Sequence, residues 1–159
     1  MAQEPQQNQA EQNTGPVFSI EKLYVHDASI EVPNAPAIFT ERTTPQINVE
    51  LGNAVEQVQD GIFNVSIKVT VTATIQDKTA FLVEVNQSGI FAIRNVPQEN
   101  LEPILSVACP NILFPYAREA ISDMVTRAGF MPVLLNPINF EALYLQQQQQ
   151  AAQAAGAPN

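Results

Sequence analysis

The sequence is poor in the residues that build most catalytic and metal sites. Its 159 residues include one histidine, one cysteine and no tryptophan, and its six glycines are scattered singly. No CxxC pair, no histidine-rich ligand set and no phosphate-cradling glycine loop is present, which argues against a zinc site or a nucleotide-binding loop. We therefore expect no catalytic residues, no metal and no cofactor.

The single histidine and the single cysteine both have structural interpretations. His26 precedes Asp27 in a predicted strand, where consecutive side chains point to opposite faces, so the two cannot form a catalytic dyad with each other. Cys109 flanks a proline in an apolar segment, which favours a buried structural thiol over a nucleophile. One cysteine cannot form an internal disulfide and is compatible with a reducing compartment.

Long apolar runs are also missing. Apolar runs such as residues 133–135 are far shorter than the about 20 residues that span a bilayer. Met1 is followed by polar residues and alanine rather than by a basic segment and an apolar run, so no targeting segment is visible. We therefore expect a soluble protein in the cytoplasm. We also expect one domain, because domains cluster near roughly 100 to 150 residues.

Basic residues are scarce. Seven Lys and Arg stand against 16 Asp and Glu, which gives a formal net charge of −9. Such a balance repels nucleic acid and anionic lipid and favours a basic protein partner. The alternative is that the negative charge only keeps the protein in solution.

Composition divides the chain into three parts. Residues 1–16 are predicted to be a disordered arm, because they contain too little apolar surface to offset the entropy of ordering. Residues 17–145 are the predicted folded domain. Residues 146–159 are rich in Gln and Ala, which are good helix formers, and we predict a tail that is partly helical or disordered.

The first half of the folded part has the alternation of an antiparallel sheet. Residues 62–75 place apolar side chains on one face and polar side chains on the other. The apolar phase shifts between Ile20 and Leu23, which suggests a bulge in the first strand. Residues 33–45 contain three prolines and are predicted to form a stiff crossover without helix. The four predicted strands are residues 17–32, 46–55, 62–75 and 79–93.

The second half has helical spacing. Apolar residues recur every three or four positions after Pro97, and further ones widen the stripe to a second side. Pro110 and Pro115 lead us to expect that the main helix begins at residues 111–114. Gly129 is expected to end it, and Asn139 to cap a last helix.

These elements predict an α+β fold in which a four-stranded antiparallel sheet carries helices packed on one face. A helix that is apolar on two sides needs two surfaces to cover it. The sheet supplies one, and we expect a second copy of the chain to supply the other in a symmetric oligomer.

Acidic side chains gather on one predicted sheet face. Asp27, Ser29 and Glu31 share a face of the first strand, and Leu82 and Glu84 share a face of the fourth. If both strands lie in one sheet, three acids form a patch with Leu82 as an apolar contact. Strand faces are often charged for solubility alone, and that is the alternative.

The assembled segments resemble the SecB protein-export chaperone family from about Val17 to Leu145. Several motifs in the right order and with compatible spacing carry this resemblance. They are VPNAP (32–36), VTVTA (69–73), TAFLVEV (79–85), GIF (89–91), CPNILFPYARE (109–119) and the NF of PINF (137–140).

The resemblance implies a homotetramer, a dimer of dimers in which helices lie between two eight-stranded sheets. Family members bind unfolded secretory precursors, the clients, in apolar grooves and deliver them to the motor ATPase SecA. The positions that match the family's SecA-binding surface are Asp27, Glu31, Leu82 and Glu84. The matching client-binding positions are Ile47, Val49, Leu51, Phe130, Leu134, Phe140, Leu143 and Tyr144, with Phe39 in the crossover as a further candidate. The expected oligomer contacts are Val83, Val85, Ile112, Leu113, Tyr116, Ala117, Ile121 and Met124.

This chain departs from the family in two places. Some relatives carry a tryptophan in the crossover, whereas this chain has Thr43 and Thr44 there, so its groove is expected to be less aromatic. The family's C-terminal tail can contact SecA, but residues 146–159 contain no charged residue, which leaves that contact open. Two alternatives are a SecB-like chaperone of another client system, such as a toxin–antitoxin pair, and an oligomeric α+β enzyme with an apolar pocket. A core role is the alternative for Phe140 and Leu143.

Overall fold

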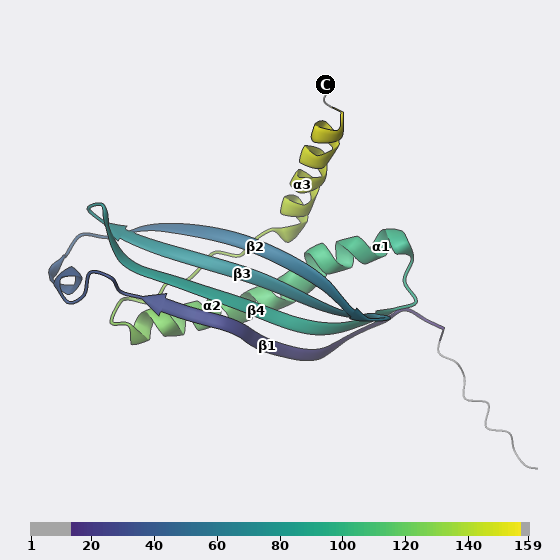
Figure 1. Ribbon diagram of the computed structural model, residues 1–159, viewed down its shortest axis with the longest axis horizontal. Helices are drawn as coiled ribbons and strands as arrows, with labels where there is room; N and C mark the ends of the chain where they lie inside the picture. Colours follow the sequence, from purple (N-terminus) through teal and green to yellow (C-terminus); the bar gives the residue numbers. More distant parts are fainter. Residues whose placement is uncertain (1–13, 157–159) are drawn as a thin grey trace, which may run out of the picture.

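Alternating apolar and polar residues build a four-stranded antiparallel sheet in the computed structural model, which describes residues 14–156 (Figure 1). The strands are β1 (Val17–Glu31), β2 (Gln46–Gln59), β3 (Ile62–Ile75) and β4 (Lys78–Arg94). Their order across the sheet is β1-β4-β3-β2, which makes β1 and β2 the two edges. The helices lie on one face of this sheet, and the predicted fold class is confirmed.

The core lies between the two central strands and the helices. On β3 and β4 the apolar side chains that face the helices are buried, including Val65, Val69, Phe81 and Val83, while the intervening residues point to the opposite, outer face. Strict alternation in the sequence therefore predicted the buried face correctly, because side chains along a strand point to opposite faces in turn.

Strand β1 bends twice. The predicted bulge is confirmed, since the pairing of β1 with β4 shifts between Ile20 and Lys22. A second shift lies between Val25 and Asp27 and was not predicted. Its signal is present in the sequence: the apolar positions on the helix side change there from odd to even numbers.

The crossover between β1 and β2 contains a turn of 3-10 helix, η1 (Ala37–Thr40). The prediction of a crossover without helix was wrong. Ile38 is buried to 3% exposure, and its backbone N–H donates to the carbonyl of Asn34 at 2.9 Å. The Asn34 side chain in turn donates to the carbonyl of Thr79 in β4 at 2.9 Å, so the turn is fastened to the end of the sheet.

The main helix begins earlier than expected. The segments α1 (Gln98–Pro103), the π-helical η2 (Ile104–Ala108) and α2 (Cys109–Arg127) follow one another without a gap, so the expected start at 111–114 was wrong. The Cys109 N–H donates to the carbonyl of Ile104, five residues back. This wider turn lets the helical path pass Pro110, whose ring would clash with the preceding turn of a regular α-helix.

Helix α2 packs against β4 and β3. Its close approach depends on Gly89 of β4, because a Cβ there would lie 2.8 Å from Phe91 Cε2 and 3.1 Å from Leu113 Cδ2. As predicted, α2 is followed by Gly129, which has the positive φ of +96° typical of a helix C-terminus.

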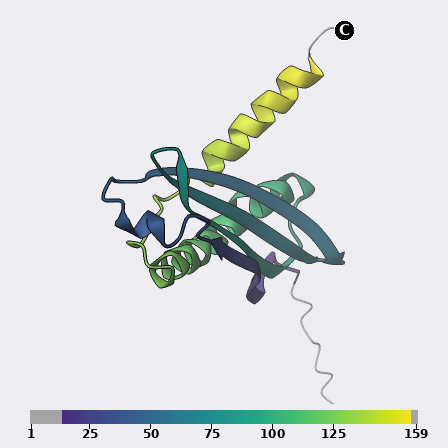
Figure 2. The same cartoon turned by 60° about the vertical axis from the view of Figure 1, so that its left-hand side comes forward.

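Helix α3 (Phe140–Ala155) is capped as predicted, since the Asn139 side chain accepts a hydrogen bond from the Ala142 N–H at 2.9 Å. It projects from the body of the chain and carries the Gln- and Ala-rich segment (Figure 2). Of the predicted N-terminal arm, residues 1–13 lie outside the described residues.

Candidate functional site

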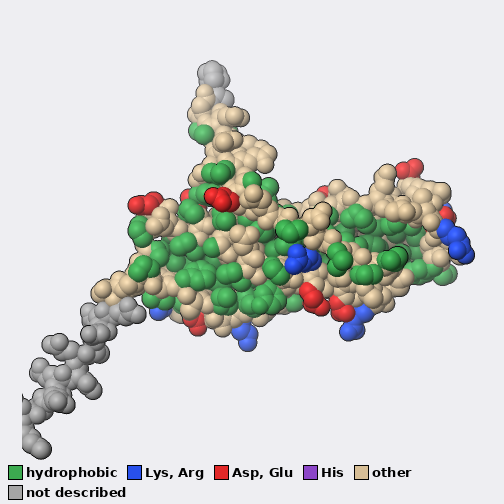
Figure 3. Space-filling view, turned by 180° about the vertical axis from the view of Figure 1, so that it is seen from behind, with side chains coloured by type: hydrophobic (Ala, Val, Ile, Leu, Met, Phe, Trp, Pro, Cys, Tyr) green, Lys and Arg blue, Asp and Glu red, His purple; other side chains and the backbone are tan. Residues whose placement is uncertain are grey.

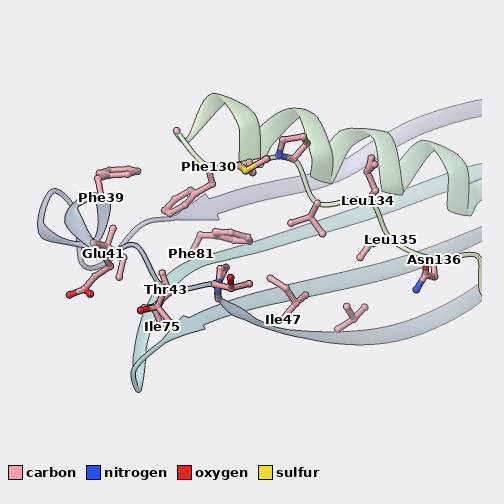
Figure 4. Close-up of a pocket in the computed structure, with 18 of the residues that line it drawn as sticks. Phe39, Glu41, Thr43, Ile47, Ile75, Phe81, Phe130, Leu134, Leu135 and Asn136 are labelled. Carbon is pink, nitrogen blue, oxygen red and sulfur yellow. The ribbon is translucent and has the colours of Figure 1, made fainter.

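An open apolar groove lies beside strand β2. It has a volume of about 970 Å³ and runs between β2, the crossover that contains η1, and the connection from α2 to α3 at residues 129–138. Ile47 from β2 lies on one side of it, and Leu134 and Leu135 from the connection lie on the other (Figure 4).

The groove exists because the helices leave one strand of the sheet uncovered. Helix α2 packs mainly on β4 and β3, so the apolar side chains of β2 on that face stay accessible. Ile47 and Val49 are 44% and 42% exposed. Hydrophobic side chains are spread over the whole helix-bearing face (Figure 3).

Aromatic rings form one end of the groove. Phe130 stacks at tilted angles between Phe39 and Phe81, with ring centroids 5.1 Å and 5.0 Å away. Phe39 comes from the crossover and Phe130 from the connection after α2 (Figure 4). Glu41 and Arg42 are the charged residues among those that line the groove, so within the described chain its surface is predominantly apolar.

A second, smaller hollow of about 120 Å³ lies farther along β2, where this strand meets η2 and α3. The eight predicted client-binding residues divide equally between the two hollows. Ile47, Val49, Phe130 and Leu134 line the large groove, and Leu51, Phe140, Leu143 and Tyr144 line the small hollow. Phe140 is only 4% exposed and meets Phe114 edge to face at 6.0 Å, so it also belongs to the core.

Sequence reasoning missed part of the groove wall. The groove is also lined by Met131 and Leu135, together with the other residues of the connection at 129–138. Met131 is 86% exposed. The signal was the composition of residues 129–138, which are mostly apolar although they form no helix or strand. Connecting segments at a protein surface are usually polar, so such a run indicates a binding surface.

The predicted acidic residues lie together on the outer face of the sheet. Across the β1–β4 pair, Asp27 lies opposite Asn86, Ser29 opposite Glu84, and Glu31 opposite Leu82. Directly opposed residues of an antiparallel pair point to the same face, so Asp27, Glu31, Leu82 and Glu84 share one surface, which we call the acidic patch.

Glu84 is held from the β3 side. Its Oε1 forms an ion pair with Lys68 Nζ at 3.3 Å, and its Oε2 accepts a hydrogen bond from Thr70 Oγ1 at 3.0 Å. Asn86, the next outer-face residue on β4, has a buried Oδ1 that has no hydrogen-bond partner within residues 14–156.

The residues expected at oligomer contacts fall on two sides of the structure. Five of them are fully buried between the sheet and α2 of this one chain: Val83, Val85, Leu113, Ala117 and Ile121. The other three, Ile112, Tyr116 and Met124, lie along another side of α2, where Tyr116 is 49% exposed. This second set is the more accessible one, and its contact with another subunit stays a prediction.

The thiol of Cys109 is fully buried where α2 begins. Burial raises its pKa to about 12, because desolvation disfavours the thiolate. At neutral pH it is therefore a protonated, unreactive packing group. Residues 14–156 contain no group of three or more His, Cys, Asp or Glu placed to hold a metal ion. No helix in this part of the chain is both long and apolar enough to cross a bilayer.

Comparison with known proteins agrees with this geometry. The sequence profile of the family described as "Preprotein translocase subunit SecB" matches residues 11–151. Protein-export protein SecB of Methylobacillus flagellatus is 64% identical over 93% of this chain and 94% of its own length. Its counterpart in Dechloromonas aromatica is 60% identical over 93% of this chain and 95% of its own length.

Among solved structures, a SecB-like chaperone of Mycobacterium tuberculosis in complex with an antitoxin peptide has a similar fold. Its TM-score is 0.64 at 18% identity, and the match covers 76% of this chain and 90% of that one. The family match and the relatives at 60–64% identity over most of the chain show a chaperone. The chain belongs to the SecB family of protein-export chaperones.

Proposed function

We propose that this chain binds unfolded secretory precursors along β2 and delivers them to SecA from the acidic patch. The single observation that carries the client site is the apolar face of β2, which lies open along both hollows in a chain of the SecB family. Each apolar client side chain buried there contributes roughly 1.5 to 3 kcal/mol. Ordering an unfolded segment costs about 2 to 5 kcal/mol or more, so several contacts in a row are needed.

Sequence-tolerant binding follows from the chemistry of the groove. Apolar contact has no directional requirement, and only Glu41 and Arg42 bring charge to the lining within the described chain. The antitoxin-chaperone alternative is not favoured, because the relatives at 60–64% identity are protein-export proteins. The expected setting is the cytoplasm, with no cofactor, metal or catalytic activity.

The acidic patch suits a basic partner. Its three carboxylates lie on a sheet face that the helices do not cover, and charges at such a rim mainly steer association and weaken with salt. For assembly we propose the family's homotetramer, a dimer of dimers, with Ile112, Tyr116 and Met124 of α2 as direct contacts. The chain division at residues 16 and 145 stays a prediction.

The client site is tested by placing a charge in the groove. Val49→Asp puts a carboxylate on the groove face of β2, whereas Asn48→Asp adds the same charge to the outer face of the same strand. We expect Val49→Asp to weaken binding of a fluorescent, chemically unfolded precursor about tenfold or more, since a charge buried against apolar chain is costly. Asn48→Asp should bind like the wild type. Equal binding by all three proteins would contradict the groove assignment.

A further inference from the structure

Glu84 differs from the other two acids of the patch, because it is already paired within the chain. Its two carboxylate oxygens are engaged by Lys68 and Thr70, both from β3. Neither Asp27 nor Glu31 forms an ion pair with another residue in the range 14–156. The patch is therefore asymmetric: β1 presents two free carboxylates, and β4 presents one that is turned toward an internal cation.

The pair is placed where it can open. The side chains of Lys68 and Glu84 are 55% and 30% exposed, so water reaches both groups and their attraction is screened. Thr70 lies directly opposite Glu84 in the register and holds the second oxygen independently of Lys68. Loss of the lysine contact therefore leaves the carboxylate oriented on the outer face.

We propose that Lys68 competes with a cationic side chain of SecA for Glu84 and thereby lowers the affinity of the acidic patch. This inference rests on the proposed SecA contact. Two effects act in the same direction: the partner's cation must displace the ammonium from Glu84, and the displaced ammonium repels that cation at short range.

The competition also adds specificity. A partner with a lone, weakly placed lysine gains little at Glu84, because it only replaces one ammonium by another. A guanidinium that binds the carboxylate through two hydrogen bonds gains more than Lys68 loses. Lys68 therefore selects partners that present an arginine to Glu84, by a repulsive element built into the binding surface.

The test removes the charge of Lys68 and compares the effect on SecA binding with that of removing another lysine charge from the same sheet face. Lys22 of β1 lies opposite Ile90 on the outer face and has no ion pair with another residue in the range 14–156. Lys68→Gln and Lys22→Gln thus change the net charge equally, but only the first frees Glu84. The dissociation constant for SecA is measured for both variants and for wild type, at low and moderate salt.

We expect Lys68→Gln to bind SecA about two- to fivefold more tightly than Lys22→Gln. In a Glu84→Gln background this difference should shrink to the general repulsion by one ammonium, since no carboxylate is left at position 84 to compete for. Circular dichroism and the urea midpoint show that each variant is folded.

The possible results distinguish a failure of the Lys68 competition from a failure of the proposed delivery to SecA. A wild-type chain that does not bind catalytically active SecA overturns the proposed delivery and this inference together. If wild type binds but the two lysine variants bind equally, or if Lys68→Gln binds more weakly, the inference alone is overturned. An undiminished difference in the Glu84→Gln background also overturns it, because the effect would then not pass through Glu84.

Discussion

At the scale of single residues, the buried thiol of Cys109 links packing to pH. Its pKa is raised to about 12 in the folded chain from an ordinary value of 9.0. Above pH 9 the unfolded chain therefore loses this proton first, which favours unfolding. The stability contributed by the protonated thiol is fully present below pH 9 and is lost progressively as the pH rises toward 12.

This effect is measurable by difference. We expect the free energy of unfolding of the wild type to fall more steeply between pH 9 and 11 than that of Cys109→Ala, by at most about 1.4 kcal/mol per pH unit. Urea unfolding at several pH values gives both slopes, and other titrating groups cancel in the comparison. Parallel slopes would show that the thiol ionises equally in both states.

Gly89 allows α2 to pack closely on β4, because Phe91 and Leu113 leave no room for a side chain there. A methyl group there would meet Phe91 and Leu113, and it would push α2 away from β4. We expect Gly89→Ala to cost about 1 to 3 kcal/mol in the free energy of unfolding, as overpacking does. Gly52→Ala on β2 is the matched control, because nothing lies within 4 Å of its added Cβ. Urea unfolding of both variants checks this, and equal stabilities would show that the helix adjusts freely.

At the scale of elements, the sequence predicted strands better than irregular segments. Alternation over residues 62–75 directly reports which side chains are buried, because the strand period is two. The first bulge in β1 was visible as a phase shift, and the second had the same signal at Val25 to Asp27. The two bulges cancel in phase, so Asp27 and Glu31 stay on the outer face, and it is Leu23 and Val25 between the bulges that are turned to the helix side.

The helical half shows where local rules reach their limit. Proline rules predicted a late start for the main helix, but a π turn accommodates Pro110. Whether a chain breaks or widens at a proline depends on packing, here the burial of Cys109 and Leu113 against the sheet, which no local pattern contains. Met131 and Leu135 of the groove wall were missed although the apolar composition of residues 129–138 carried a signal, because the shape of this wall depends on contacts with the crossover.

The candidate site was predicted from two kinds of information. Alternation brought Asp27, Glu31 and Glu84 to one face, and the register supports that placement. The client-binding positions came from the family resemblance, because periodicity alone cannot tell a groove from a core. Phe140 shows the difficulty, as it lines the small hollow and packs against Phe114 at once.

At the scale of the whole molecule, a single chain leaves much apolar surface uncovered. Tyr116 on α2, Phe18 and Ile20 on β1, and Val55 on β2 are all 44% to 49% exposed. Isolated exposed apolar residues are common, but several on one face indicate a protein interface. Among residues 14–156 no strand pairs with the outer edge of β1, which likewise offers backbone groups to a neighbouring strand.

Tyr116 tests this expectation. We expect Tyr116→Glu to lower the molar mass measured by light scattering from near four chains of 17.4 kDa to a smaller assembly, because it places a charge in the proposed contact. Thr126→Glu adds the same charge at an exposed position of the same helix and should leave the mass unchanged. A wild-type monomer, or a tetramer indifferent to the first change, would contradict the assignment of this side of α2.

Helix α2 leaves the groove face of β2 uncovered, and this bears on the stability of the protein when a client is bound. The helix packs mainly on β4 and β3, so in the proposed complex a bound client segment completes the apolar layer over that face of β2. Binding that is confined to the folded state raises the free energy of unfolding by mass action, by about 2.7 kcal/mol at a ligand concentration 100 times the dissociation constant. Under the proposed binding in the groove, we expect the chaperone to melt at a higher temperature while it holds a client than when the groove is empty.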